Sequence, residues 1–158
     1  MSFRIGSGFD VHKFESGREL WLGGVKIDHT GLAGHSDADV LTHAIIDSLL
    51  GASALGDIGE FFPDSDPQFR NIRSTEMLKT VVKKIYEEGW TIENVDTVVI
   101  CETPKISQYK NEMRKTLSNI MKIPTDSIMI KGKTTEKLGF TGRGEGIAAM
   151  SSALLSRR

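Results

Sequence analysis

Hydrophobic and polar positions follow two periods along the chain, and the changes from one to the other outline its secondary structure. Apolar residues three and four positions apart are typical of helices. That spacing occurs in four segments: Asp37–Leu50, Ser74–Glu88, Ile106–Met121 and Glu145–Leu155. Short apolar or β-branched runs next to turn residues are typical of strands, and five occur: Phe3–Phe9, Glu19–Leu22, Val25–Ile27, Val95–Cys101 and Ser127–Ile130. Strands separated by helices predict one compact α/β (α+β) domain, residues 1–158, in which a β-sheet packs against helices.

The first predicted helix has sequence signals at both ends. Ser36 is expected as its N-cap, with Asp39 completing an S-x-x-D box, and Gly51 is expected to end it. His43 lies four residues after Asp39 and four before Asp47, so these three residues are expected to share one polar face of the helix.

Composition excludes several classes of protein. Hydrophobic residues make up 39% of the 158 residues, which excludes a disordered chain, and from the length we expect one catalytic domain without a second. The single Cys101 excludes a disulfide scaffold and a four-thiolate metal site. The net charge of −1 gives no reason to expect nucleic acid, and no stretch is long and apolar enough to span a membrane. We therefore expect a soluble, cytoplasmic protein without nucleic-acid or membrane partners.

Asp10 and His12 lie two residues apart at the end of the first predicted strand, so both side chains leave the same face. Such a pair alone is most often an ordinary surface pair. Together with His43 it becomes two imidazoles and one carboxylate with an open fourth position, the pattern of a catalytic zinc site. The spacing leaves open whether the three residues meet, and a solvated helix face is the alternative for His43.

Four segments have residues suited to a phosphorylated ligand. Gly34–Asp37 precedes the first predicted helix, where free backbone N–H groups attract anions, although a plain N-cap explains Ser36 as well. Carboxylates in Asp57–Gly59 and Phe62–Pro67 suit sugar hydroxyls, but Pro and Asp there favour ordinary turns. Lys131–Gly146 contains lysines, threonines, an arginine and several glycines, which suit phosphate oxygens, and a generic flexible loop is the alternative.

Six motifs, in order along the chain, resemble those of the 2-C-methyl-D-erythritol 2,4-cyclodiphosphate synthase family, the cyclase of the non-mevalonate isoprenoid pathway. They are R-I-G-S-G-F-D-V-H (4–12), G-H-S-D-A-D-V (34–40), G-D-I-G (56–59), F-P-D-S-D-P (62–67), P-K (104–105) and T-T-E-K-L-G-F-T-G-R-G-E-G (134–146). The resemblance implies a homotrimer with active sites between neighbouring subunits. It also implies a cytidine-diphosphate substrate, 4-diphosphocytidyl-2-C-methyl-D-erythritol 2-phosphate. Its 2-phosphate attacks the β-phosphorus, which closes the cyclic diphosphate and releases CMP.

The resemblance also implies roles for the matching positions. Zn²⁺ would be held by Asp10, His12 and His43, and Mg²⁺ or Mn²⁺ bridging the diphosphate would be held by Glu136. The transition state would be stabilised by His35 and Thr134. The positions expected to contact the substrate are Asp10, His12, His35, Ser36, Asp57, Ile58, Gly59, Phe62, Pro63, Asp64, Ser65, Asp66, Cys101, Glu102, Thr103, Pro104, Lys105, Ile106, Ser107, Lys133, Thr134, Thr135, Glu136, Phe140 and Arg143. In this assignment residues 57 and 59 face the ribose, 62–66 the erythritol part, and 101–107 of the adjacent subunit the cytosine.

The chain departs from the family pattern at two places. Lys133 stands where many members have threonine, and Cys101-Glu102-Thr103 is less typical before the P-K motif. Two other functions use the same residues: a zinc-dependent phosphohydrolase with water as the nucleophile, or a non-catalytic sensor of an isoprenoid diphosphate. For the sensor, the ligand would occupy a central trimer cavity lined by Phe9, Arg143 and Glu145.

Overall fold

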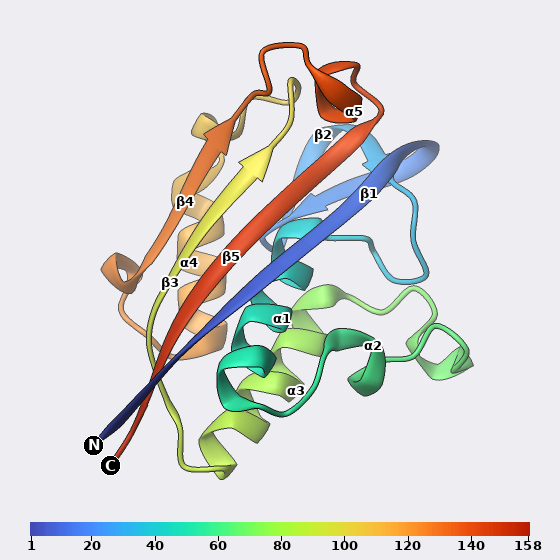
Figure 1. The fold of residues 1–158 in the computed structure, drawn as a ribbon. Helices are drawn as coiled ribbons and strands as arrows, with labels where there is room; N and C mark the ends of the chain where they lie inside the picture. Colours follow the sequence, from blue (N-terminus) through green and yellow to red (C-terminus); the bar gives the residue numbers. More distant parts are fainter.

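A five-stranded sheet in the order β2-β1-β5-β3-β4 runs through the molecule, and the long helices lie on one of its faces (Figure 1). The computed structural model describes residues 1–158. Its strands are β1 (Ser2–Leu22), β2 (Val25–Leu32), β3 (Thr91–Ile100), β4 (Ile128–Lys133) and β5 (Gly146–Arg157). Its α-helices are α1 (Val40–Ser53), α2 (Ile58–Phe61), α3 (Ser74–Glu87), α4 (Lys110–Met121) and α5 (Gly139–Gly142). Only β3 and β4 are parallel, so the fold is α+β, as the sequence predicts.

Strand β5 corrects the prediction of a helix over Glu145–Leu155. It lies between β1 and β3 and pairs with both, so its backbone N–H and C=O groups bond across the sheet. The Ala-, Ser- and Leu-rich sequence favours a helix locally, but propensity is a weak preference that tertiary pairing overrides. The residues facing the helices recur with a period of two and are all buried: Ile147, Ala149, Ser151, Ala153 and Leu155.

Helix α1 begins later than predicted, at Val40, and its N-cap is Asp39 instead of Ser36. The Asp39 carboxylate accepts hydrogen bonds from a backbone amide of the first turn of its helix (3.0 Å) and from the amides of Gly23 and Gly24 (2.9 and 2.8 Å). Gly23 and Gly24 form the turn between β1 and β2, so one buried carboxylate both caps the helix and fixes this turn.

The prediction that Asp39, His43 and Asp47 share one polar face of α1 is also wrong, because α1 is buried on nearly all sides. Asp39 faces the β1–β2 turn, and the half-buried Asp47 accepts a hydrogen bond from the amide of Ile58 (2.8 Å). Only His43 of the three faces β1. The helix also continues through Gly51 and ends at Ser53, since the left-handed residue that stops it is Ala54 (φ 57°).

Two smaller boundaries differ from expectation. The predicted strands Phe3–Phe9 and Glu19–Leu22 are parts of the single strand β1, whose register with β2 shifts at Glu19. The predicted helix over Ile106–Met121 is a short 3-10 helix, Ile106–Gln108, followed by α4.

Helix α1 lies directly against the backbone of β1. A Cβ atom on Gly6 would stand 2.0 Å from the carbonyl oxygen of Ser48, and one on Gly8 would stand 1.9 Å from that of Ala44. Glycine at both positions therefore permits the close approach. On the neighbouring strand β5, Oγ of Ser151 makes a 2.8 Å hydrogen bond with Oγ of Ser48. As a result, the part of α1 that carries His43 is held at a fixed distance from β1.

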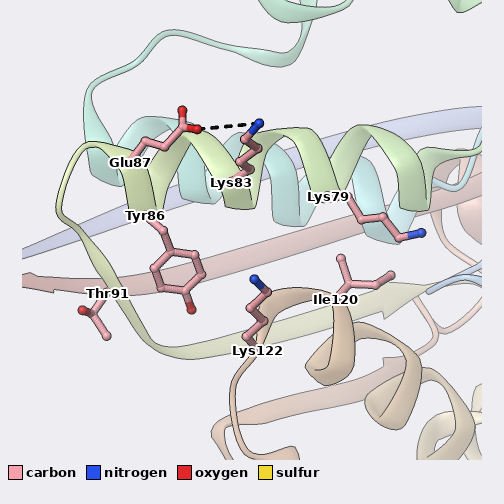
Figure 2. A pocket seen from close by; sticks show the side chains of 7 residues that line it. All are labelled: Lys79, Lys83, Tyr86, Glu87, Thr91, Ile120 and Lys122. Carbon is pink, nitrogen blue, oxygen red and sulfur yellow. Dashed lines mark ion pairs between the residues drawn. The ribbon is translucent and has the colours of Figure 1, made fainter.

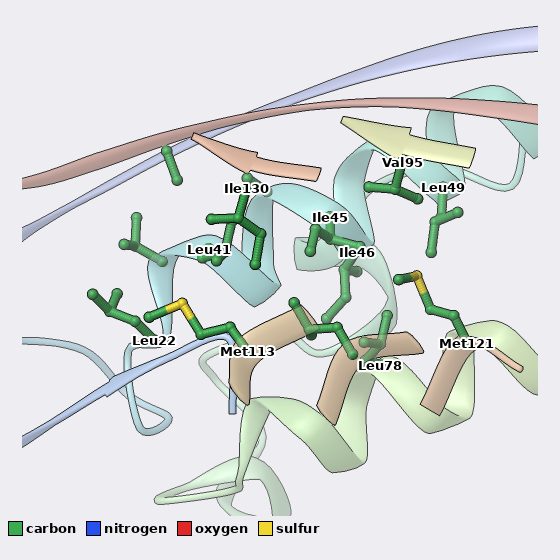
Figure 3. Close-up of a cluster of buried hydrophobic side chains, with 14 of the residues drawn as sticks. Leu22, Leu41, Ile45, Ile46, Leu49, Leu78, Val95, Met113, Met121 and Ile130 are labelled. Carbon is green, nitrogen blue, oxygen red and sulfur yellow. The ribbon is translucent and has the colours of Figure 1, made fainter. Parts of the chain in front are cut away.

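The hydrophobic core lies between the sheet and the helix layer, with α1 in the middle (Figure 3). Leu41, Ile45, Ile46 and Leu49 of α1 are fully buried. Side chains from α3, α4 and the sheet surround them: Leu22, Leu78, Val95, Met113, Met121 and Ile130. Because α1 contacts both layers, its position is determined by the whole core.

The opposite face of the sheet has no helix over it and exposes large apolar side chains. Phe3, Ile5 and Phe9 of β1 are 59%, 81% and 56% exposed, and Met150 of β5 is 50% exposed. We call this the open sheet face. No helix of the molecule combines the length and the apolar character that crossing a membrane requires.

Candidate active site

Asp10 and His12 of β1 and His43 of α1 converge on one point. Oδ2 of Asp10 lies 2.9 Å from Nε2 of His12 and 3.0 Å from Nδ1 of His43. The two imidazole nitrogens are 3.3 Å apart. The strand places Asp10 and His12 on the face that α1 covers, so the three residues do meet. Each offers one ligand atom within 4.8 Å of the others, and the set is therefore able to hold a metal ion.

The outer nitrogen of each imidazole has a partner that fixes the ring. Nδ1 of His12 donates to the carbonyl oxygen of Ala33 at 2.7 Å. Nε2 of His43 lies 2.8 Å from Oγ of Ser74 and 3.2 Å from Oγ of Ser36. A metal ion at the shared point would replace any proton on the inner nitrogens, and the protonated outer nitrogens would then leave each inner nitrogen with a lone pair for the metal. The donor set thus fits a divalent metal ion.

Asp10 provides a negative charge at this point. Burial by itself would raise its pKa, but hydrogen bonds from His12 and His43 outweigh burial and hold the pKa of Asp10 well below its usual range. Burial lowers the pKa of His12, whereas its hydrogen bond to Asp10 raises it, and the net shift is upward. Asp10 is therefore a carboxylate throughout the physiological pH range.

The cluster opens into a cavity of about 390 Å³, which we call the metal-side cavity. Seven further residues expected to contact the substrate line this cavity, together with Gly34 of the same motif: His35, Ser36, Ile58, Gly59, Phe62, Pro63 and Asp64. The Gly34–Asp37 segment is a loop and not a helix N-terminus, because α1 starts only at Val40. Nε2 of His35 is buried and has no hydrogen-bond partner, which leaves one polar atom available to a ligand.

A second cavity of about 280 Å³ lies where β3 and β4 end, and we call it the loop-side cavity. Its lining includes eight of the expected residues: Cys101, Glu102, Pro104, Lys105, Ile106, Ser107, Lys133 and Thr134. Burial, together with the negative charge of Glu102, raises the pKa of the Cys101 thiol to about 11, so this residue is not a nucleophile at neutral pH.

The two cavities lie apart within one chain. Val11 pairs with Ala148, Ala148 with Ile100, and Ile100 with Lys133. Three strand spacings therefore separate Val11 from Lys133, roughly 14 Å. Asp10 and His12, on either side of Val11, face the helices. Ile130 of β4 is buried on that same face, and Lys133, three positions later, leaves the opposite face of the strand. One chain therefore carries two half-sites that lie apart across the sheet.

Several expected site residues line neither cavity. Asp57 accepts a hydrogen bond from the amide of Glu60 and caps α2, and Asp66 accepts one from the amide of Gln68. The others are Ser65, Thr103, Thr135, Glu136, Phe140 and Arg143. Thr135 donates to the carbonyl oxygen of Leu138 (2.6 Å), Thr103 contacts His29, and Arg143 pairs with Glu145 (3.0 Å). The segment 62–66 is a turn, as its Pro and Asp residues predict.

The structure adds wall residues that sequence reasoning missed. Phe69, Ile72 and Met77 complete the metal-side cavity, and Lys110 and Gly132 the loop-side cavity. Their only sequence signal is apolar or polar character, which does not distinguish a cavity wall from the core or surface.

A cavity larger than both of these, about 850 Å³, lies elsewhere, between α3, the end of α4 and the start of β3 (Figure 2). Lys79 pairs with Glu76 (2.6 Å) and Lys83 with Glu87 (3.8 Å). The hydroxyl of Tyr86 donates to a backbone carbonyl. Since these polar groups have partners within the chain, this groove lacks the chemistry of the metal-side cavity.

An α+β domain with an Asp/His/His cluster in one cavity and a lysine- and threonine-lined loop in another defines a small enzyme with a candidate metal site. The YgbB family matches residues 3–156, and the chain belongs to this family. A 2-C-methyl-D-erythritol 2,4-cyclodiphosphate synthase from Clostridium acetobutylicum is 54% identical over 153 residues, which cover 96% of this chain and 99% of that protein.

Two further comparisons agree on the fold and family. The bifunctional enzyme IspD/IspF from Erythrobacter litoralis is 50% identical over 156 residues; the match covers 98% of this chain but only 40% of that relative's length. The structure of IspF from Plasmodium falciparum in complex with CDP superposes with a TM-score of 0.87 at 38% identity, and the match covers 99% of this chain and 97% of that one.

Proposed function

We propose that this chain is a 2-C-methyl-D-erythritol 2,4-cyclodiphosphate synthase. It converts 4-diphosphocytidyl-2-C-methyl-D-erythritol 2-phosphate to the 2,4-cyclodiphosphate and releases CMP, a step of isoprenoid precursor biosynthesis. The observation that carries this proposal is the Asp10–His12–His43 cluster, open to a cavity, in a family whose full-length relatives have that name. Residues 1–158 form its catalytic domain.

The proposed reaction needs charge control more than a general base. A phosphate monoester has a second pKa near 6, so the attacking 2-phosphate is anionic at pH 7. The barrier is the repulsion between phosphates and the requirement for in-line geometry. The unpartnered Nε2 of His35 supports a role as a hydrogen-bonding group for a phosphate oxygen. We assign the exposed Thr134 hydroxyl, at the loop-side cavity, the same role on the other side of the diphosphate.

We assign Zn²⁺ to Asp10, His12 and His43, because two imidazoles and one carboxylate with an open position are typical of catalytic zinc. Glu136 is assigned to Mg²⁺ or Mn²⁺, which favour carboxylate and phosphate oxygens. Bound divalent metals supply positive charge that neutralises and orients phosphate oxygens. The residues of this chain supply the ligands, the cavity walls that exclude water and the hydrogen-bonding groups.

We further propose a homotrimer in which each active site combines the metal-side cavity of one subunit with the loop-side cavity of its neighbour. The separation of the two half-sites within one chain supports a composite site, because the backbones of Val11 and Lys133 are roughly 14 Å apart and a diphosphate is much shorter than that. The apolar open sheet face supports an interface there, since exposed patches of this kind mark contact surfaces. Binding of an isoprenoid diphosphate in the trimer's central cavity stays a prediction.

Phosphorus NMR of the purified protein with the cytidyl substrate tests the reaction. The expected products are the cyclic diphosphate and CMP, in equal amounts. Free phosphate in place of the ring would identify a phosphohydrolase and contradict the proposal.

Subunit mixing tests the composite site. His43→Ala and Thr134→Ala proteins are each expected to be nearly inactive. After both are unfolded and refolded together at 1:1, about a quarter of the interfaces pair two intact halves and recover activity. Thoroughly exchanged trimers that stay inactive would place each site within one chain.

We assign the protein to the cytoplasm, where its free, buried Cys101 is in keeping with a reducing compartment.

A further inference from the structure

Ser74, the first residue of α3, contacts the metal cluster from outside, although the proposed reaction does not use it. It is fully buried, and its Oγ lies 2.8 Å from Nε2 of His43. Because His43 presents Nδ1 to the cluster, its Nε2 has to carry the ring proton and donate it outward. A buried N–H without an acceptor is costly, so the identity of this acceptor matters.

Asp37 makes Ser74 an acceptor toward His43. The single hydroxyl proton of Ser74 is donated to Oδ1 of Asp37, which leaves the Oγ lone pairs free for the Nε2–H of His43. Asp37 is itself fixed in place. Its oxygens accept from the backbone amides of Ser74 and Asp39, both at 3.1 Å, and Arg73 lies 3.3 Å from its Oδ2. Hydrogen bonds thus run from the imidazole through one hydroxyl to a carboxylate.

Ser36 is the other hydroxyl near Nε2 of His43, but it is farther away, at 3.2 Å. Its Oγ also accepts a hydrogen bond from the amide of Ala38 (3.1 Å), and it lines the metal-side cavity. Ser36 is therefore directed to the cavity and its ligand, whereas the Ser74 hydroxyl has no hydrogen-bond partner other than His43 and Asp37.

We propose that Ser74 and Asp37 are positioning residues for the metal ligand His43, an inference that rests on the proposed metal site. They select the Nε2–H form of the imidazole, fix the plane of the ring and make Nδ1 a better ligand. Loss of partners of this kind typically weakens metal affinity 10- to 100-fold.

The zinc affinity of the metal-stripped protein, measured by competition with a coloured chelator, tests this proposal. Ser74→Ala is expected to bind Zn²⁺ 10- to 100-fold more weakly than the unaltered protein. Ser74→Thr keeps the hydroxyl and is expected to recover most of the affinity. The matched control is Ser118→Ala, which removes a buried hydroxyl from α4, far from the cluster, and is expected to leave zinc affinity unchanged. The visible spectrum of the Co²⁺-loaded protein is expected to change in Ser74→Ala alone.

The possible outcomes separate this proposal from the function on which it rests. If the unaltered chain binds no Zn²⁺, the metal site itself is wrong. If it binds Zn²⁺ and a folded Ser74→Ala protein binds equally well, only the role of Ser74 is wrong. If Ser74→Ala does not fold, proton NMR of the zinc-loaded, unaltered protein decides. A slowly exchanging Nε2 proton of His43 close to the β-protons of Ser74 is expected, and one close only to Ser36 would overturn the proposal.

Discussion

Substitution of Gly8 by alanine tests how the separation between α1 and β1 determines both stability and the metal cluster. The added Cβ would lie 1.9 Å from the carbonyl oxygen of Ala44 and 2.9 Å from the amide nitrogen of Ser48. Both contacts are with helix backbone, which cannot rotate away as a side chain can. To reach ordinary contact, the nearer distance has to grow from 1.9 Å to about 3.4 Å, so the helix has to move away from the strand.

The expected cost follows from that displacement. Overpacking a core costs about 1–3 kcal/mol, and a clash with backbone on both sides belongs at the upper end, so we expect Gly8→Ala to lower the free energy of unfolding by about 3 kcal/mol. Asp10 lies two residues farther along β1, and His43 is next to Ala44. Moving α1 therefore also separates the carboxylate oxygen from the imidazole nitrogen, which now lie 3.0 Å apart, and zinc affinity falls as well.

Urea unfolding with excess chelator, at matched protein concentration, measures the stability change without a metal contribution. Gly51→Ala is the matched control on the same helix, because its Cβ would have no neighbour closer than 4.0 Å. Alanine favours helix interiors over glycine, so this control is expected to gain about 0.5–1 kcal/mol and keep its zinc affinity. A Gly8→Ala protein as stable as the unaltered chain would refute the claim that α1 rests on the β1 backbone.

Three other perturbations address separate parts of the molecule. Burial favours the protonated thiol of Cys101, so the rate of its alkylation by iodoacetamide in the folded protein is expected to keep rising with pH toward about 11. In the urea-unfolded control the rate is expected to level off near the usual thiol pKa of 9.0, and a midpoint near 9.0 in the folded protein would contradict this prediction. Asp39→Ala leaves three backbone amides, two of them buried, without their acceptor and is expected to destabilise the fold by about 3 kcal/mol or more in urea unfolding, whereas a change below about 1 kcal/mol would contradict the capping role. Glu102→Ala removes the acceptor of the Lys137 amide, so hydrogen exchange at Lys137 is expected to become faster, with Glu102→Gln close to the unaltered rate; equal rates in all three proteins would show that this contact does not order the loop.

The spacing of apolar residues correctly predicted those elements whose local sequence preference agrees with their packing in the fold. The helix over residues 74–88 is α3 within one residue, because an apolar stripe facing the core and a polar opposite face leave one solution. The position of Ser36 shows the limit of local signals. Its hydroxyl is a plausible cap, yet the β1–β2 turn requires an acceptor for two amides, and Asp39 serves these and the helix together. That requirement comes from a turn 15 residues earlier, which no local motif records.

The candidate site was predictable in part for a similar reason. The shared face of Asp10 and His12 follows from the strand period alone, whereas their meeting with His43 requires knowledge of how α1 lies on the sheet. Ser74 had no signal except its place at the start of a predicted helix. A contact that depends on two elements crossing at a particular angle leaves no trace in the spacing of residues along the chain.

The wrong prediction of a helix at β5 and the meeting of the three predicted metal ligands have one physical origin. Ala149, Ser151 and Ala153 face α1 from β5, just as Gly6 and Gly8 face it from β1. Small side chains on both strands allow a helix that is buried on nearly all sides to lie against the sheet backbone. The alanines and serines that give β5 the composition of a helix are therefore present to make room for one. Larger β-branched residues, the usual strand formers, would signal the strand correctly but move α1 outward, and His43 with it, away from Asp10 and His12.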